Sequence, residues 1–395
     1  MAPKGQPSYA RQTLSSVNKN RTSLNPPAPP EETATTTSKT PTANTRIATA
    51  TVRDIDFEET QLISRGVEIF RQTNLQGLRI AGRAFAHFNS DAPSDPATSR
   101  GFYRKAVSKA LDGRTERGID HSMFLSVAND FVESVHETYR ILGNSYLPEP
   151  DYKTYAFQEL LIGQRIFLTR DTTRQLCVVR SGEWSLKPRP SKDNCSWHEP
   201  PLLSDQPPSK VFGFDIHADC QFWLCIKILN ADYRRHVQHV VHCKALGTFC
   251  PYFSVEFKAR VDDTRVVENQ VLAAGLISLF NRYQLKLQAH PHPTTDQLKP
   301  VRHYGMTMEK EFWKVWLFEP KTADGAWAGC TVRVLDSGNC LEQGGTLPFL
   351  QWINEIHRWG LSQYALNCEE DIEEILGKNS ADLRMSLAEQ RRSSS

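Results

Sequence analysis

The sequence lacks several signatures that would assign it to a common class of protein. No apolar run approaches the ~20 residues that cross a bilayer, and the first residues, Met-Ala-Pro-Lys-Gly-Gln-Pro-Ser, contain no apolar stretch of a secretory signal. There is no Cys-X-X-Cys pair among the nine cysteines, and no phosphate-binding glycine loop, Gly-X-Ser-X-Gly elbow or dinucleotide fingerprint. We therefore expect an intracellular protein, nuclear or cytoplasmic and not secreted, with reduced cysteines and no membrane partner.

Strong charge of one sign is also missing. The 395 residues carry a net charge of +2, and 39% of them are hydrophobic and 23% charged, which is typical of a globular protein. Residues 1–50 hold six Lys or Arg and two Glu, a net of +4, so the remainder carries −2. A slightly acidic remainder disfavours strong non-specific binding of nucleic acid but leaves room for a local basic cleft.

The chain divides into four predicted parts. The first is rich in Ser, Thr, Pro, Ala and Asn and buries too little apolar surface to fold. The parts are a disordered tail at 1–52, a helical block at 53–150, a main domain at 151–365, and a C-terminal helix with a disordered tail at 366–395. The helical block either packs on the main domain or forms a small lobe of its own.

Apolar spacing predicts the elements of the folded parts. Helices are expected at 54–72, 100–111, 121–142, 232–244, 264–283, 347–362 and 369–376; strands or short apolar segments are expected at 175–180, 182–186, 211–216, 221–228, 252–259, 312–318 and 330–335. Helices that bracket strands indicate an α/β protein with a small central mixed β-sheet flanked by helices. The strand at 252–258 and the helix at 264–283 are expected at its centre.

One segment of the main domain carries a chemical pattern. In the strand that follows Cys250-Pro251, side chains alternate between the two faces. The apolar side chains on one face are Phe253, Val255 and Phe257, and the polar side chains on the other are Ser254, Glu256 and Lys258. A carboxylate and an ammonium two residues apart are spaced to hold a metal ion and a charged oxygen side by side.

This Glu-X-Lys segment, followed by a helix with Asn269-Gln270, resembles the PD-(D/E)XK nuclease-like domain that is common in fungal proteins. The resemblance implies a RecB-like, restriction-endonuclease-like core and hydrolysis of phosphodiester bonds in DNA or RNA with Mg²⁺ or Mn²⁺. It also implies that Glu256 ligates the metal, that Lys258 orients the water or the phosphate, and that Gln270 supports the site.

The family places an aspartate on an upstream strand, and this sequence departs from that pattern. Alignment on Gly213-Phe214 puts Ser209 at the aspartate position, and a hydroxyl cannot supply the charge of a carboxylate. Asp215 is the predicted substitute metal ligand, and Asp205 in the preceding loop is the alternative. The segment Asp215-Ile216-His217-Ala218-Asp219 also offers metal ligands beside Glu256, although we interpret it as a turn that closes the strand.

Two functions therefore remain open, and the sequence does not decide whether the protein is an enzyme. One is a nuclease, and the other is a metal-free, nuclease-like accessory or interaction protein, acting for example beside a gene cluster or in genome defence. A cluster of potential zinc ligands, His236, His239 and His242 with Cys243 and Cys250, lacks the paired short spacings of structural zinc sites. We interpret it as a helix surface, and the acidic run at 369–374 as a solvated helix face.

Overall fold

The computed structural model describes residues 48–71, 82–92, 118–119, 123–163, 174–175, 178–187, 190, 199–205, 208–244, 247–258, 264–342 and 344–377, with scattered residues between 102 and 109. Most of the predicted N-terminal tail and the predicted C-terminal tail beyond residue 377 lie outside these residues. Most of the helix predicted at 100–111 also lies outside them. All secondary structure below belongs to the described part of the chain.

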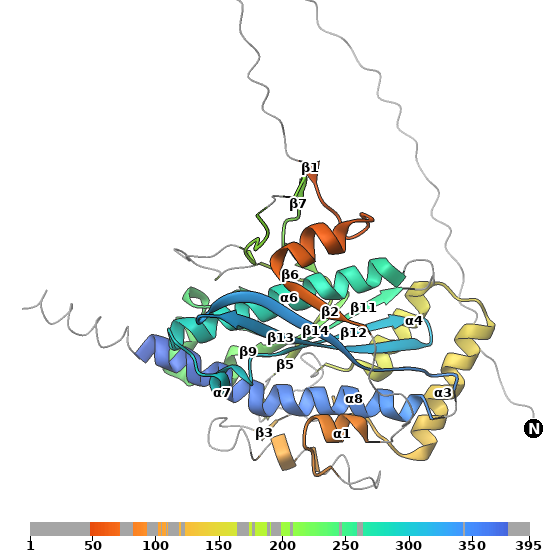
Figure 1. Ribbon diagram of the computed structural model, residues 1–395. Coiled ribbons are helices and arrows are strands. Elements are labelled where there is room, and N and C mark those ends of the chain that lie inside the picture. Colours follow the sequence, from red (N-terminus) through yellow and green to blue (C-terminus); the bar gives the residue numbers. More distant parts are fainter. Residues whose placement is uncertain are drawn as a thin grey trace, which may run out of the picture. The chain divides into compact units, whose positions relative to one another are not determined.

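The fold is built on a mixed sheet of eight strands (Figure 1). Its order is β2-β14-β13-β12-β11-β9-β5, with β10 beside β11; β11 is parallel to β12 and β14 to β2, and the other neighbours are antiparallel. The strands are β2 (Val67–Phe70), β5 (Val178–Ser181), β9 (Cys220–Cys225), β10 (Cys243–Lys244), β11 (Thr248–Lys258), β12 (His303–Glu309), β13 (Phe312–Ala323) and β14 (Ala326–Asn339). The predicted α/β class with a mixed sheet is confirmed, and the sheet is larger than expected.

Three short strand pairs lie outside this sheet. They are β1 (Ala48–Thr49) with β7 (Lys210–Val211), β3 (Gly118–Ile119) with β4 (Arg174–Gln175), and β6 (Ser185–Leu186) with β8 (Ile216–His217). Each pair joins segments that are far apart in the sequence. Local apolar patterns therefore do not predict which of these segments pair with each other.

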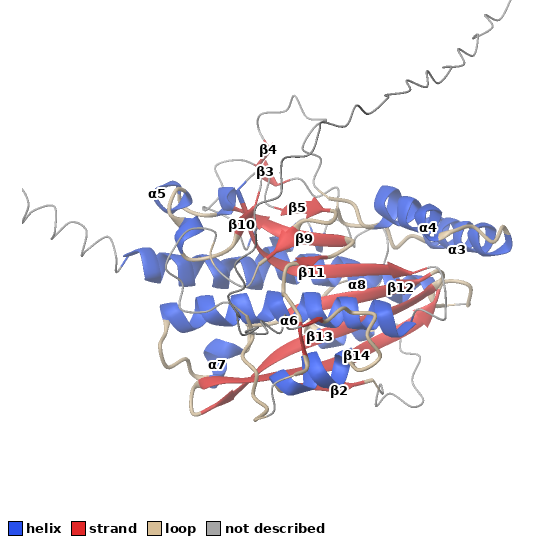
Figure 2. Ribbon diagram, turned by 90° about the horizontal axis from the view of Figure 1, so that it is seen from above, coloured by secondary structure: helices blue, strands red, loops and turns tan. Residues whose placement is uncertain are grey.

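Two long helices cover the opposite faces of the sheet, α6 (Thr264–Ala289) on one and α8 (Thr346–Trp359) on the other (Figures 1 and 2). After α8 the chain passes through η8 (Gly360–Tyr364) and stays helical over 365–377. The remaining helical segments are η1 (Glu58–Leu62), η2 (Ile63–Arg65), α1 (Arg83–His87), α3 (Asn129–Asn144), α4 (Glu149–Tyr155), η3 (Ala156–Leu160), η4 (Ile226–Ile228), α5 (Ala231–Arg234), η5 (Val237–His239) and α7 (Thr295–Leu298). The predicted flanking of the sheet by helices is confirmed.

Strand β11 is central because it is buried along almost its whole length. A strand that is covered on both faces reads as a nearly continuous apolar run, as this one does. Strands β5, β9 and β11 form an antiparallel meander, and α6 then carries the chain over the sheet to β12, which is parallel to β11. Such a crossover is required because parallel neighbours cannot be joined by a tight turn.

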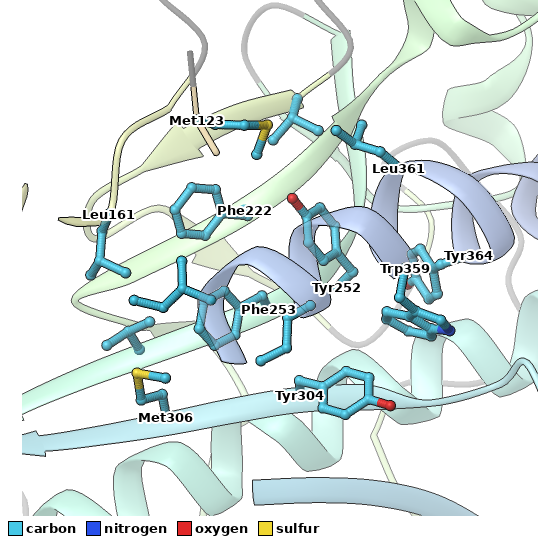
Figure 3. Close-up of a cluster of buried hydrophobic side chains, with 14 of the residues drawn as sticks. Met123, Leu161, Phe222, Tyr252, Phe253, Tyr304, Met306, Trp359, Leu361 and Tyr364 are labelled. Atoms are coloured by element: carbon cyan, nitrogen blue, oxygen red, sulfur yellow. The ribbon is translucent and has the colours of Figure 1, made fainter. Parts of the chain in front are cut away.

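The apolar face of β11 packs toward α8. Phe253, Val255 and Phe257 belong to the same core cluster as Trp352 and Trp359. Figure 3 shows part of this cluster, with Phe222, Phe253 and Met306 on the strands and Trp359 and Tyr364 on the helix. Because side chains alternate along a strand, Ser254 and Glu256 are directed to the other face, the side of α6.

Several predicted elements are wrong. The helix expected at 54–72 ends at Arg65, and Val67–Phe70 forms β2, which pairs with β14. The helix expected at 232–244 is replaced by the short α5 and η5 and by β10. Strand β12 was not predicted, because its polar residues are buried by partners from distant segments; His303, for example, contacts Ser254.

The predicted block at 53–150 shares the main fold. Strand β2 lies in the central sheet, and the predicted boundary at residue 150 falls within α4. The buried residues of α3 also join the core cluster beneath the sheet. These contacts place the segment in one compact unit with the rest of the described chain.

The packing of α6 on the sheet yields a first testable prediction, at Gly275. A Cβ atom at this position would lie 2.3–2.5 Å from ring carbons of Phe318, which is fully buried. We expect Gly275→Ala to destabilise the fold by ~1–3 kcal/mol, the usual cost of overpacking a core. Urea denaturation measures the change, and Gly213→Ala is the control, since nothing lies within 4 Å of its Cβ position. Equal unfolding midpoints for the two variants would contradict this packing.

Candidate functional site

The pairing of β9 with β11 brings a second carboxylate to Glu256. In the antiparallel register Cys220 is the partner of Val255, so the residue before Cys220 lies beside the residue after Val255. These residues are Asp219 and Glu256. The backbone N–H of Phe257 donates a hydrogen bond of 2.9 Å to Oδ2 of Asp219, which holds the aspartate against the end of β11.

Glu256 is the more deeply buried residue of this pair. It is 1% exposed, and its Oε2 makes no hydrogen bond among the described residues. Burial raises the pKa of Glu256 well above the usual range, the negative charge of Asp219 raises it further, and Lys258 offsets part of the increase. A buried carboxyl with an unpartnered oxygen and a second carboxyl beside it is an arrangement that a cation would stabilise.

Two lysines surround the carboxyl pair. Lys153 on α4 donates a hydrogen bond of 2.7 Å from Nζ to Oδ1 of Asp219. Lys258 donates from Nζ to the carbonyl oxygen of Phe257 at 2.8 Å, and the same Nζ lies 3.8 Å from Oε1 of Glu149 on α4. Helix α4 packs on β11 near one end of the sheet (Figures 1 and 2). It thereby contributes one cation and one carboxylate to the neighbourhood of Asp219 and Lys258.

The contact between Lys153 and Asp219 supports a second prediction. Burial lowers the pKa of Lys153, but the hydrogen bond to Asp219 and the negative charges of nearby carboxylates together outweigh this effect, so the pKa is raised. Because these side chains are only 22% and 15% exposed, we expect Lys153→Met to cost ~1–2 kcal/mol. Urea denaturation tests this against Lys187→Met, whose partner Asp215 lies 3.5 Å away with both side chains about half exposed; the control should change stability by less than ~0.5 kcal/mol. Similar losses for both variants would argue against a special role for the Lys153 pair.

The structure does not bring Asp215 to Glu256. Asp215 lies between β7 and β8, accepts a hydrogen bond from Ser185, and has Nζ of Lys187 and Nε2 of His217 at 3.5 and 3.6 Å. Asp205 and Ser209 are exposed. The carboxylate that accompanies Glu256 is Asp219, from the segment interpreted above as a turn. The sequence predicted Asp215 as the substitute ligand, whereas the β9–β11 register selects Asp219, four residues further on.

Gln270, the third predicted catalytic residue, lies on α6. That helix packs on β11 and β12, and Gln270 is half-buried, with an Oε1 that makes no hydrogen bond among the described residues. The Oε1 of Gln270, on the helix that packs on the sheet, and the Oε2 of Glu256 are thus both buried without a hydrogen-bond partner among the described residues. In the described part of the chain, the Oε1 of Gln270 makes no hydrogen bond to Lys258.

The donor set suits a hard divalent cation better than zinc. Asp219 and Glu256 supply carboxylate oxygens, and Mg²⁺ is commonly held by one or two carboxylates together with water and substrate phosphate. Among the described residues no group of three or more His, Cys, Asp or Glu is positioned to hold a metal ion. In the suspected zinc cluster, the ring of buried His242 pairs with the carbonyl oxygen of Ser185, and the segment does not form one continuous helix.

Comparisons with known proteins do not place the chain in a family: no protein-family model matches it, and no curated protein matches it. Of the helices that the structure describes, none has the length and apolar character to span a membrane. The geometry around Asp219, Glu256 and Lys258 is therefore the basis for inferring a function.

Proposed function

We propose that this protein is a nuclease that hydrolyses phosphodiester bonds in DNA or RNA with Mg²⁺ or Mn²⁺. The observation that carries the proposal is the pairing of Asp219 with Glu256 at adjacent strand ends, with Lys258 two residues further along β11. The PD-(D/E)XK site, which the Glu-X-Lys segment resembles, also contains an aspartate from another strand. Asp219 occupies such a position, so Ser209 no longer argues against activity.

The side chains divide the chemical work by charge. Asp219 and Glu256 would hold the cation, with the unpartnered Oε2 of Glu256 as one ligand atom. When bound, the cation supplies positive charge that activates a water molecule and stabilises the phosphate. Lys258 has three ammonium N–H donors, and one hydrogen bond, to Phe257, uses only part of this capacity. It would orient the attacking water or a phosphate oxygen.

The placement of the site also supports the proposal. Substrates of open α/β proteins generally bind beyond the carboxyl ends of parallel strands. Glu256 and Lys258 are in the last three residues of β11, where α6 begins the crossover to parallel strand β12. Gln270 on α6 would support a group bound at that end. A nucleic acid is the partner that fits this chemistry.

A second function is favoured by one specific contact. Lys153 donates to Asp219 at 2.7 Å and neutralises the carboxylate that a cation would need. If that ion pair persists in the presence of divalent cations, the fold serves as a metal-free accessory or interaction module. The distinction concerns cation binding, so it can be measured without a known substrate.

Two measurements test the proposal. Calorimetric titration with Mg²⁺ and Mn²⁺ should show a saturable heat that is lost in Glu256→Ala. Cleavage of single-stranded, double-stranded and branched DNA and RNA should require the cation, stop with a chelator, and fail in Glu256→Ala and in Lys258→Ala. Cleavage that persists at the wild-type rate in Glu256→Ala would eliminate the assignment, and absent metal binding would favour the accessory module.

A further inference from the structure

Two cysteine side chains, Cys250 and Cys368, meet in the core and have no role in the proposed nuclease site. Cys250 lies in β11 at an interruption of the β9–β11 register, and its backbone has φ of 42°, a left-handed conformation that is uncommon outside glycine. Cys368 lies in the helical segment 365–377 and is fully buried. The thiol of Cys250 donates a hydrogen bond to the sulfur of Cys368.

Tyr364, one helical turn before Cys368, links the same two segments. Its hydroxyl donates a hydrogen bond to the carbonyl oxygen of Pro251 at 3.2 Å, and its side chain also interacts with that of Cys368. Figure 3 shows Tyr364 on the helix that faces Tyr252 of β11, and the two rings are 6.1 Å apart. The helix and the strand are therefore already in contact around the two sulfurs.

The charges near Cys368 favour its thiolate form. Arg282 and Lys286 on α6 are 1% and 3% exposed, and both pair with Asp371, at 2.7 and 2.6 Å. Both cations share this one carboxylate, and a thiolate at Cys368 would place a further negative charge beside them. Burial raises the pKa of Cys368, but the hydrogen bond from Cys250 and the charge of Arg282 outweigh it, so the pKa lies below the usual value.

Part of the acidic run at 369–374 is buried, and its Asp371 pairs with the two cations described above. It was interpreted as a solvated helix face, but Asp371 is fully buried and Glu369 is 3% exposed. Asp371 anchors the two cations that surround Cys368. The prediction was wrong because the sequence pattern does not reveal buried cations from α6.

Three other buried cysteines, Cys220, Cys330 and Cys340, differ from Cys368 in the pKa of the thiol. Burial raises the pKa of Cys220 to about 12, and it raises the pKa of Cys330 and of Cys340 further. Buried thiols without a thiolate-stabilising environment are inert. Cys250 and Cys368 are thus distinguished by their mutual hydrogen bond and by the cations beside them.

A small cavity reaches Cys250, the member of the pair that lies in β11. It is lined by Cys250, Pro251, His242, Asn281 and Arg282, among others. The Nε of Arg282 and the Oδ1 of Asn281 have no hydrogen-bond partner among the described residues. The other lining residues include the apolar Leu186, Val240 and Val241. The polar atoms of Asn281 and Arg282 suit a molecule about the size of water, and hydrogen peroxide is an oxidant of similar size and polarity.

We propose that Cys250 and Cys368 form a redox-reactive pair that hydrogen peroxide oxidises to a disulfide. The Cys368 thiolate attacks one peroxide oxygen; the O–O bond breaks, the sulfur becomes a sulfenic acid, and the hydroxide released takes a proton to become water. Cys250, having lost its proton, then attacks the sulfur of Cys368; the S–O bond breaks and hydroxide leaves, to be protonated to a second water. Two thiols and one peroxide yield one disulfide and two waters.

The disulfide would fasten the C-terminal helical segment to β11. This strand also carries Glu256 and Lys258, six and eight residues after Cys250. The pair does not depend on the proposed nuclease activity, since it requires neither a metal ion nor a nucleic acid. Its test can therefore succeed or fail independently.

Peptide mapping of the intact protein tests the pair. The reduced protein is treated with hydrogen peroxide, its free thiols are alkylated in denaturant, and its peptides are analysed without reduction. We expect a linked peptide pair containing Cys250 and Cys368, absent in Cys368→Ser and in Cys250→Ser. The matched control is Cys330→Ser, which removes an equally buried cysteine and should form the link as the wild type does.

A sulfenic acid trap identifies the attacking sulfur. In Cys250→Ser a carbon nucleophile such as dimedone should label Cys368, whereas Cys368→Ser should show no label at Cys250. Full alkylation of both cysteines in the peroxide-treated wild type would overturn the pair, a result that requires no variant to fold. Labelling of Cys250 in Cys368→Ser, without labelling of Cys368 in Cys250→Ser, would overturn the assigned roles.

Discussion

Asp219→Asn is expected to reduce Mg²⁺-dependent cleavage by ~10²–10³-fold or more, whereas Asp215→Asn should leave the rate within about twofold of wild type. The physical reason is the position of each carboxylate: Asp219 lies against Glu256, whereas the partners of Asp215 are Ser185, Lys187 and His217. Loss of a charged group that holds or faces the reacting centre removes several kcal/mol of transition-state stabilisation. Asparagine keeps the shape of the aspartate, so the hydrogen bond from Phe257 can be retained.

Single-turnover cleavage rates at saturating Mg²⁺ measure this difference, with cation binding followed by calorimetry. Both variants should fold, which circular dichroism and unfolding midpoints verify. The outcome that contradicts the site is the reverse order, a strong loss in Asp215→Asn with activity retained in Asp219→Asn. It would return the metal shell to Asp215, the substitute ligand predicted from the sequence.

Glu256→Gln is expected to stabilise the metal-free protein at neutral and alkaline pH. Glu256 is 1% exposed, has an unpartnered Oε2, and lies beside a second carboxylate. A glutamine amide has nearly the same shape, carries no charge and can donate to Asp219. An unsatisfied buried group costs ~1–3 kcal/mol, and each kcal/mol shifts Tm by about 2–4 °C in a domain of this size.

The pH dependence follows from the raised pKa of Glu256. In the unfolded chain the carboxyl has an ordinary pKa of 4.5, and burial together with Asp219 raises the folded value well above it. The folded state therefore binds the proton more strongly, so its stabilising contribution is full below the unfolded pKa and is lost as pH rises through the folded pKa. The advantage of Glu256→Gln over wild type should be small in acid and should increase with pH.

Thermal unfolding of both proteins at several pH values, with and without Mg²⁺, measures these effects. A bound cation replaces the proton as the partner of the wild-type carboxyl pair, so Mg²⁺ should raise the Tm of wild type and leave that of Glu256→Gln nearly unchanged. A constant difference between the two proteins across pH, with no effect of Mg²⁺, would show that the carboxyl pair neither titrates nor binds the cation.

Part of the site follows from local sequence. The alternation from Phe253 to Lys258 predicted a strand with an apolar face and a charged face, and the structure has that strand within β11. The helix predicted at 264–283 is also present and longer, as α6. Both predictions succeed because periodicity within one segment reports which of its sides is buried.

Contacts between distant segments decided the rest. Asp219 became the partner of Glu256 through the β9–β11 register, and a shift of one residue would direct it to the opposite face. The meeting of Cys250 with Cys368 joins a strand to a helix more than a hundred residues later, beside cations from a third element. The sequence alone determined the α/β class, the central strand and helix, and which face of that strand is charged. Only the tertiary structure decided which distant carboxylates, cations and thiols meet them, because strand register and helix docking depend on the packing of the whole core.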